Sequence, residues 1–569
     1  MSVNIPGVAM MVLFYLLVLG TGIWAATKTK RLRKNKQANQ MDVALLGNRG
    51  IHLAVGVFTM TATFTGGGFV VGLTEMVYTP DFGLAWAVMP ITISSSFIIG
   101  GVFLAKPMRD RKYVTMMDPF HDKYGKVISG VFSVALMLTD LVWVPSTLMG
   151  ASMSVILDLP YTHCIWISAT VSIIYTLLGG LISVAYTDVV QLTLMFVGMW
   201  ICVPFLLTNP YSDDISTTAL NFTYQAPWVS SVDSDKIWTW IDQTLLLVSA
   251  LHLQLHLYTS VHYVLTSNCP PTPMTIFGNL ACQDYYQRVL SASSSATARL
   301  VNFLAAPIVI LFSIPSILIG AVAASTDWNK TAYGSPSPLE RGETSLIMPI
   351  ALQQLTPSFI SIVGISATTA AVMSTIDSLL LAAVSLFVSN IYKSILRTKA
   401  SDREVQWVIR IMTLVIGLTG TSLVFLEASI MSLWVLGSSI TYVFMFPQLI
   451  CVLFFDISNG YGAMAGLLVS VVLRLLSGET SLGLPVTLHF PGCTLENGVY
   501  VQHAPVSTIC MLCNFISTLL VSYLASLLFN KGVIPERFDI FDTVGNHKDE
   551  TPGAQNENEI MLDESCGNN

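Results

Sequence analysis

Charged residues are scarce in this chain. Asp, Glu, Lys and Arg together make up 11% of its 569 residues, whereas 53% are hydrophobic. Soluble domains carry about 25% charged residues and rarely sustain long apolar stretches. The composition therefore excludes a soluble multidomain protein and favours a protein whose outer surface faces lipid.

The chain also lacks catalytic signatures. It contains no HExxH, GxSxG or P-loop motif. Its nine histidines do not form a metal-ligand set, and most of its nine cysteines are interpreted as small apolar core residues. We therefore expect neither an enzyme nor an organic cofactor, and no metal other than coupling ions.

The N-terminus lacks the basic region and the small-residue cleavage site of a signal peptide, so Gly7 to Ala26 is expected to remain as a membrane span. Runs of about 20 mostly apolar residues recur along the chain and predict about thirteen spans in total. They lie near residues 6–27, 50–78, 84–105, 127–157, 163–182, 187–207, 237–265, 298–324, 359–392, 406–426, 430–455, 461–476 and 505–529. All must be helical, because lipid offers no partner for backbone polar groups.

Basic residues predict the orientation of these spans. They gather in the loops 28–36, 106–112 and 393–403, which fall on one side if the N-terminus is outside. That side is cytoplasmic by the positive-inside rule. The glycosylation sequons at Asn221 and Asn329 then fall outside. We expect a multi-pass protein with an acidic cytoplasmic tail.

A glycine triplet interrupts the second predicted span. Gly66-Gly-Gly68 follows threonines at 61, 63 and 65, and both residue types weaken a helix at this depth. One interpretation is a close helix–helix contact through small residues. The other is a broken helix whose freed carbonyls bind an ion. The residues alone leave both open.

A second polar cluster lies inside the span near 359–392. Ser374, Thr375, Asp377 and Ser378 supply hard oxygen ligands that suit a hard cation. A carboxylate at that depth predicts function. The structural alternative has the hydroxyls bonded to carbonyls one turn back and Asp377 paired with a neighbouring helix.

Two further residues are candidates for a substrate site. Trp143 lies deep in its span, where an aromatic face can hold a cation, although core packing is the alternative for any single tryptophan. Asp242 lies one turn into its span and is either a ligand for a substrate or ion, or a partner for a basic side chain.

Several ordered motifs resemble the sodium:solute symporter family, and most closely its choline-transporting branch. They are Phe58-Thr-Met-Thr-Ala-Thr, the glycine triplet, Gly83-Leu-Ala-Trp-Ala, Ala105-Lys-Pro-Met-Arg, Tyr113-Val-Thr-Met, Gly179-Gly-Leu-Ile-Ser-Val-Ala-Tyr-Thr-Asp-Val-Val-Gln191, Gln287-Arg-Val-Leu-Ser and Ala324-Ser-Thr-Asp-Trp-Asn. The resemblance runs from about residue 6 to about residue 545.

The resemblance implies an all-α membrane protein with a LeuT-type core of two inverted five-helix repeats. One transmembrane domain would cover 1–545, with repeats near 50–207 and 237–455, and 546–569 would be the cytoplasmic tail. It implies uptake of choline with sodium and chloride for acetylcholine synthesis, at the plasma membrane of nerve terminals and in vesicles. A monomer and a homo-oligomer are both compatible with it.

The resemblance also assigns residues. Sodium would bind backbone oxygens of Ala62, Thr65 and Ala371 and hydroxyls of Ser374 and Thr375. Asp377, Asp242 and Glu479 match acidic positions of the choline branch. An aromatic cage for the quaternary ammonium would include Trp143 and, at a second position, Phe64, whose ring binds cations less strongly than tryptophan.

The third cage position departs from the family pattern. The Gly-Gly-x-Pro-Trp-Gln break of the family is missing, and Cys282 stands at the tryptophan position. The segment 249–283 is longer than the family needs and is typical of an alternative exon or translated non-coding sequence. A symporter of another small amine, and a protein that no longer transports but acts as an ion conductor or partner, therefore remain alternatives.

Overall fold

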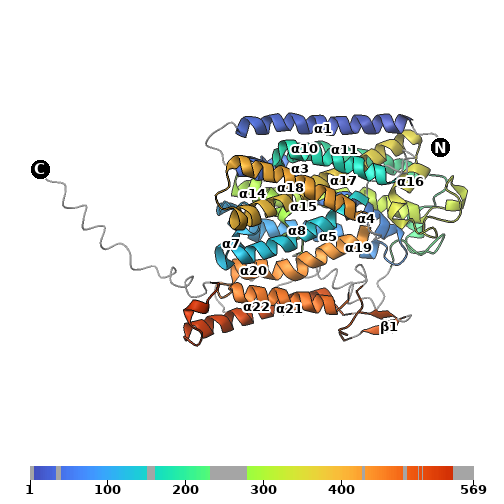
Figure 1. The fold of residues 1–569 in the computed structure, drawn as a ribbon. Helices are drawn as coiled ribbons and strands as arrows, with labels where there is room; N and C mark the ends of the chain where they lie inside the picture. Colours follow the sequence, from blue (N-terminus) through green and yellow to red (C-terminus); the bar gives the residue numbers. More distant parts are fainter. Residues whose placement is uncertain are drawn as a thin grey trace.

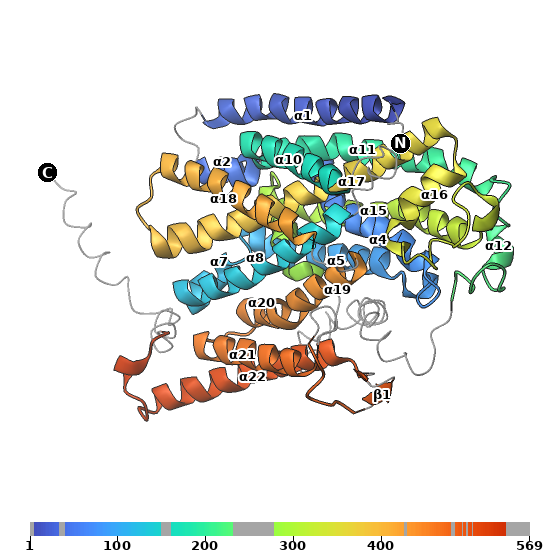
Figure 2. The same ribbon diagram turned by 45° about the vertical axis from the view of Figure 1, so that its right-hand side comes forward.

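Long apolar helices lie side by side in the structure, a computed structural model that describes residues 5–33, 40–149, 161–230, 278–425, 430–478, 484–491, 493–496, 499–502 and 504–541. In both views α1 (Ile5–Arg33) lies along one edge of the bundle, and α21 (Gly460–Leu476) and α22 (Val506–Asn530) lie along the opposite edge (Figures 1 and 2). The helices between these edges form the core.

The remaining helices follow in chain order. In the first half they are α2 (Gln40–Leu46), α3 (Leu53–Phe64), α4 (Gly67–Tyr78), α5 (Met89–Ile99), α6 (Ala105–Asp110), α7 (Asp118–Tyr124), α8 (Lys126–Met149), α10 (Tyr161–Gly179), α11 (Leu181–Leu207) and α12 (Ile215–Thr218). In the second half they are α14 (Gln283–Ser291), α15 (Ser295–Ala324), α16 (Ile347–Leu355), α17 (Ser358–Leu386), α18 (Asp402–Leu423), α19 (Ile430–Ile440) and α20 (Phe446–Phe454).

Short segments complete the described secondary structure. The π-helical segments are η3 (Gly100–Leu104), η8 (Phe387–Leu396) and η9 (Thr441–Met445). The 3₁₀ turns are η1 (Gly47–Arg49), η2 (Leu84–Trp86), η5 (Asn279–Ala281), η6 (Trp328–Lys330), η7 (Thr344–Leu346) and η11 (Glu536–Phe538). An antiparallel hairpin pairs β1 (Thr494–Glu496) with β2 (Val499–Val501).

Local sequence explains where several helices begin. Ser401 and Glu404 form a capping box at the start of α18, and Ser294 accepts from the N–H of Thr297 at the start of α15. Asn459 caps α21 in the same way by accepting from the N–H of Gly462 at 3.1 Å. These side chains satisfy N–H groups that the first turn of a helix leaves unpaired.

The described helices confirm eleven of the roughly thirteen predicted membrane spans. Ten helices are long and apolar enough to cross a membrane, and α3 with α4 forms one further, bent span. The predicted span near 461–476 is the apolar helix α21, which is shorter than the others. The predicted span 237–265 lies outside the described residues.

Helix α17 occupies the middle of the bundle. It packs against α11, α8, α4 and α18, and nearly all of its side chains from Ser361 to Leu386 are buried. A helix that is covered all round can carry polar side chains only where other helices supply partners. The polar groups of α17 therefore mark the places where function or interhelical bonding is concentrated.

The predicted helix break is present. Helix α3 ends at Phe64, α4 begins at Gly67, and their axes differ by 49°. Gly66 between them approaches α17 so closely that an added Cβ would lie 1.7 Å from Oγ1 of Thr375. Both interpretations of the glycine triplet therefore hold, because the helix break is also a close contact between helices.

Candidate ion and substrate site

The predicted sodium ligands converge where the α3–α4 break meets α17. The hydroxyl of Ser374 donates to the carbonyl oxygens of Ala62 at 3.2 Å and Ala371 at 2.9 Å. The hydroxyl of Thr375 donates to the carbonyls of Thr63 at 3.0 Å and Ala62 at 3.4 Å. The hydroxyls of Ser374 and Thr375 thus bond to carbonyls of α3 that lie more than 300 positions earlier in the chain. In an unbroken helix, backbone N–H groups would have bonded to these carbonyls.

Thr65, the last predicted backbone ligand, stands at the C-terminal end of α3. Its N–H and its hydroxyl both bond to the carbonyl of Thr61, each at 2.9 Å. The break therefore collects neutral carbonyl and hydroxyl oxygens within one small region. Such hard ligands suit Na⁺, and half-helix ends are a recurrent way to coordinate it in transporters.

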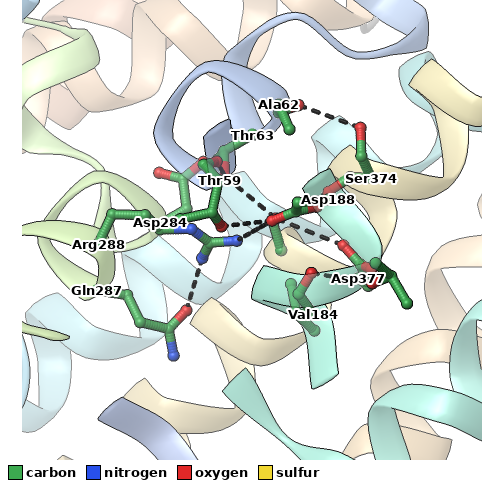
Figure 3. A network of polar contacts seen from close by, with 12 residues as sticks. Thr59, Ala62, Thr63, Val184, Asp188, Asp284, Gln287, Arg288, Ser374 and Asp377 are labelled. Carbon is green, nitrogen blue, oxygen red and sulfur yellow. Dashed lines mark hydrogen bonds and ion pairs between the residues drawn. The ribbon is translucent and has the colours of Figure 1, made fainter. Parts of the chain in front are cut away.

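A charged layer lies beside this oxygen cluster (Figure 3). Arg288 of α14 and Asp188 of α11 form an ion pair with 3.8 Å between Nη2 and Oδ2, and both side chains are fully buried. Thr59 of α3 also donates to Asp188. Arg288 donates in addition to Gln287, at 3.0 Å, and to Ser378.

Asp377 belongs to this charged layer. The hydroxyl of Tyr175 donates to its Oδ2 at 2.7 Å, and the hydroxyl of its neighbour Ser378 lies 3.2 Å from that of Thr63. Ser374 lies one turn earlier on the same helix. The structure therefore puts Asp377 next to the predicted sodium oxygens, and Ser378 connects the two groups.

Asp188 and Arg288 were not among the residues assigned a role from the sequence. Both stand in motifs that carried the family resemblance, and Asp188 lies inside the predicted span 187–207, whereas Arg288 falls between predicted spans. A charge at membrane depth predicts a functional position by itself. That signal was available for Asp188, but neither the depth of Arg288 nor the pairing of the two residues could be predicted from the sequence.

A cavity opens at the break and brings together two of the predicted substrate residues. Phe64 and Trp143 both line it, with Trp143 on α8. The remaining described lining residues are Thr63, Gly66, Gly68, Phe69, Ile93, Ser146, Thr147, Asn279, Asp284, Thr375 and Leu379. Aromatic rings beside polar oxygens suit a small organic cation.

Packing fixes both aromatic rings. Phe64 meets Phe97 edge to face, with 5.1 Å between ring centroids. Trp143 is 8% exposed and packs against α19, where a Cβ on Gly437 would lie 2.2 Å from the indole Nε1. Rings held this way lose little freedom when a ligand binds.

Cys282 is not one of the described residues that line this cavity. It is the N-terminal flanking residue of α14, is 1% exposed, and its thiol donates to the carbonyl of Gly278 at 3.3 Å. Asn279 and Asp284 line the cavity from this part of the chain instead. The predictions at Asp242 and Glu479 lie outside the described residues.

The two sequons are exposed on loops that lie together. Asn221 and Asn329 are both exposed, and the segments next to them are joined by backbone bonds of 2.9 Å from Asp213 to Ser325 and from Asp327 to Tyr211. Both loops are therefore on one face of the bundle, as the predicted orientation requires.

Comparisons with known proteins agree on the family. A family model described as the sodium:solute symporter family matches residues 45–470. High-affinity choline transporter 1 of Torpedo marmorata is 44% identical over 96% of this chain and 90% of its own length. The human high affinity choline transporter 1 is 43% identical over 99% of this chain and 93% of its own length.

A solved structure shows the same fold. It is described as the substrate-bound outward-open state of a Na⁺-coupled sialic acid symporter, and it superposes with a TM-score of 0.64 over 91% of this chain and 98% of the other. Because the sequence identity is 16%, this likeness shows the arrangement of the helices alone.

Proposed function

The chain belongs to the sodium:solute symporter family, and from this premise we propose that it is a secondary active symporter that couples sodium entry to the uptake of choline or a closely related small amine. Sodium binds at the α3–α4 break, and the organic cation binds in the adjacent cavity. The two repeats, near 50–207 and 237–455, rock around these sites to expose them alternately to each side.

One observation carries this proposal: the ion oxygens and the cavity share residues. Thr375 lines the cavity, and its hydroxyl bonds to the carbonyls of Thr63 and Ala62. Thr63 and Phe64 also line the cavity. An ion bound to these oxygens would fix the break, and so the position of the Phe64 ring. Coupling requires that each ligand favour the same conformation.

Asp377 is part of the proposed sodium region through its place beside Ser374 and Ser378. Chloride dependence, supply of choline for acetylcholine synthesis, and residence in nerve-terminal plasma membrane and vesicles are further parts of the proposal. They are supported by the 43% identity to the human high affinity choline transporter 1.

The test is uptake of radiolabelled choline by cells that express the full chain, first with sodium and then with sodium replaced isosmotically. We expect uptake above mock-transfected cells that disappears without sodium. Replacement of chloride by gluconate tests whether uptake also depends on chloride. Absence of uptake of every amine tested, with surface expression shown by biotinylation, would overturn the proposal.

A second candidate function follows from the position of Cys282. A chain that has lost a cage aromatic could conduct ions or act as a partner without carrying substrate, because the described residues near Cys282 contribute Asn279 and Asp284, and no aromatic ring, to the cavity wall. Sodium current in voltage-clamped cells, with no accumulation of labelled amine, would favour this second function.

A further inference from the structure

We propose that Asp284 is a specificity-determining residue that pairs with the ammonium group of the substrate, so that this chain carries small amines with N–H bonds at least as well as quaternary ones. The inference rests on the proposed function and refines its substrate class. It comes from the residues that line the cavity and from where their charges lie.

Asp284 is placed to meet a ligand. It lies in the first turn of α14 and lines the same cavity as Phe64 and Trp143. Its Oδ1 accepts from the N–H of Tyr285 at 2.8 Å, its carboxylate also interacts with its own backbone N–H, and no side chain of the described residues donates to it. The carboxylate therefore retains an acceptor for a group that enters the cavity.

No basic side chain of the described residues forms an ion pair with Asp284. The nearest cation along the helix is Arg288, one turn later, and its guanidinium is engaged by Asp188, Gln287 and Ser378. Arg288 is therefore a counter-charge that Asp284 shares with Asp188, and no basic side chain of the described residues is paired with Asp284 alone. A buried carboxylate in this state favours any cation that can reach it.

A second buried carboxylate, that of Asp140, also favours a cationic ligand in this region. Asp140 of α8 is 3% exposed, its Oδ2 has no hydrogen-bond partner among the described residues, and its charge interacts with that of Asp284. It lies one turn before Trp143, so the two acids approach the cavity region from α8 and α14. An unpartnered, fully buried oxygen beside the cavity is a second indication of a cationic ligand.

The described interior carries more negative than positive groups around the cavity. Asp140, Asp188, Asp284 and Asp377 are all buried, and Arg288 is the cation among them. One guanidinium can balance one of the four carboxylates when all are ionised. Coupling ions and a cationic substrate would supply the remaining positive charge during transport.

The chemistry of the cavity distinguishes two kinds of ammonium ion. A quaternary ammonium has no N–H bond and is recognised by aromatic faces. An ammonium with N–H bonds gives up hydrogen bonds to water and needs acceptors in return, and a carboxylate is the strongest neutral-pH acceptor available. This cavity has Phe64 where the family resemblance expects tryptophan, and the thiol of Cys282 points to Gly278. Phe64 binds a cation less strongly than tryptophan would, and Asp284 supplies a carboxylate on the cavity wall.

The experiment compares four labelled amines that differ only in methylation: ethanolamine, N-methylethanolamine, N,N-dimethylethanolamine and choline. Uptake is measured in cells that express the full-length wild type, Asp284→Asn, or Asp122→Asn. Asparagine keeps the size of Asp284 and removes its charge. Asp122 is exposed on α7 and is not one of the residues that line the cavity, so it controls for the same substitution elsewhere.

We expect wild-type Vmax/KM for ethanolamine to equal or exceed that for choline. Asp284→Asn should lower the ethanolamine-to-choline ratio of Vmax/KM by about tenfold or more, because a site that bonds to substrate N–H groups discriminates strongly once that acceptor is lost. Asp122→Asn should leave the ratio unchanged. A ratio that is unchanged in Asp284→Asn, or choline uptake without ethanolamine uptake in the wild type, would overturn the inference.

Two further outcomes are decided by the wild type alone. If Asp284→Asn does not reach the surface, a fall in uptake with each added methyl group supports the inference, and a rise contradicts it. Sodium-independent uptake, or no uptake of any of the four amines by surface-expressed wild type, refutes the proposed symport itself and is thereby distinguished from a failure of the Asp284 assignment.

Discussion

Gly66 is the residue on which the site geometry depends most directly. Its backbone is extended between two helices, and the hydroxyl of Thr375 occupies the space where a side chain would stand. Because Thr375 is bonded to the freed carbonyls of α3, a displacement of Thr375 would disturb the ion oxygens and the cavity together.

We therefore predict that Gly66→Ala abolishes sodium-dependent uptake. The new Cβ would lie 1.7 Å from Oγ1 and 2.4 Å from Cβ of Thr375, so α4 and α17 must separate. Gly20→Ala in α1 is the matched control, since nothing lies within 4 Å of its added Cβ. Uptake is normalised to surface protein. Wild-type uptake by surface-expressed Gly66→Ala would contradict the close contact.

Asp377 supports a second prediction at the same scale. Asp377→Ala should reduce sodium-dependent uptake to the background of mock cells, because it removes a charge beside the proposed sodium oxygens and the acceptor of Tyr175. Asp377→Asn keeps an acceptor for Tyr175 and removes only the charge. If Asp377→Ala leaves sodium-dependent uptake intact, Asp377 does not belong to the sodium region.

Among elements, α20, α21 and α22 show how polar groups join helices in lipid. Gln448 of α20 donates from Nε2 to Asn514 at 2.7 Å and Thr518 at 2.8 Å on α22, and to the carbonyl of Ala463 on α21 at 3.3 Å. All three polar side chains are buried. Their role is interhelical bonding, which is one of the forces that associate helices in a bilayer.

Thr518→Val should therefore destabilise the protein without changing transport affinity. The variant loses a hydroxyl that accepts from Gln448 and donates to Asn514, worth about 1 kcal/mol in a membrane bundle. Thr193→Val is the control, because that exposed hydroxyl bonds only within its own helix, to Val189 at 2.7 Å. Thermal unfolding in detergent and KM for choline are the measurements; equal melting temperatures for both variants would refute the expectation.

At the scale of the whole molecule, the orientation in the membrane can be tested through the sequons. Asn221 and Asn329 lie on adjoining exposed loops, which the distribution of basic residues puts outside the cell. We predict that Asn221→Gln and Asn329→Gln each increase gel mobility by one glycan, and that the double variant matches glycosidase-treated wild type. Mobility that is insensitive to both changes would contradict an external location of this face.

The amino-acid sequence by itself determined where most spans lie and which point of one span is weak, whereas the side of each loop stays a prediction. These properties depend on local composition, because about 20 apolar residues partition into lipid wherever they occur, and a glycine triplet weakens any helix. They appeared where predicted at α1, at the α3–α4 break and at α17. The residue types of the sodium cluster were also predicted, since polar side chains in apolar spans are rare.

Only the tertiary structure decided which of these residues meet. The pairing of Asp188 with Arg288 and the entry of Asp284 rather than Cys282 into the cavity join helices far apart in the chain. These contacts depend on how the helices pack and on the direction of each side chain. The hydrophobic pattern along one segment predicts neither property. Sequence patterns therefore predicted a sodium-coupled transporter, and packing defined the cavity in which we propose that its substrate binds.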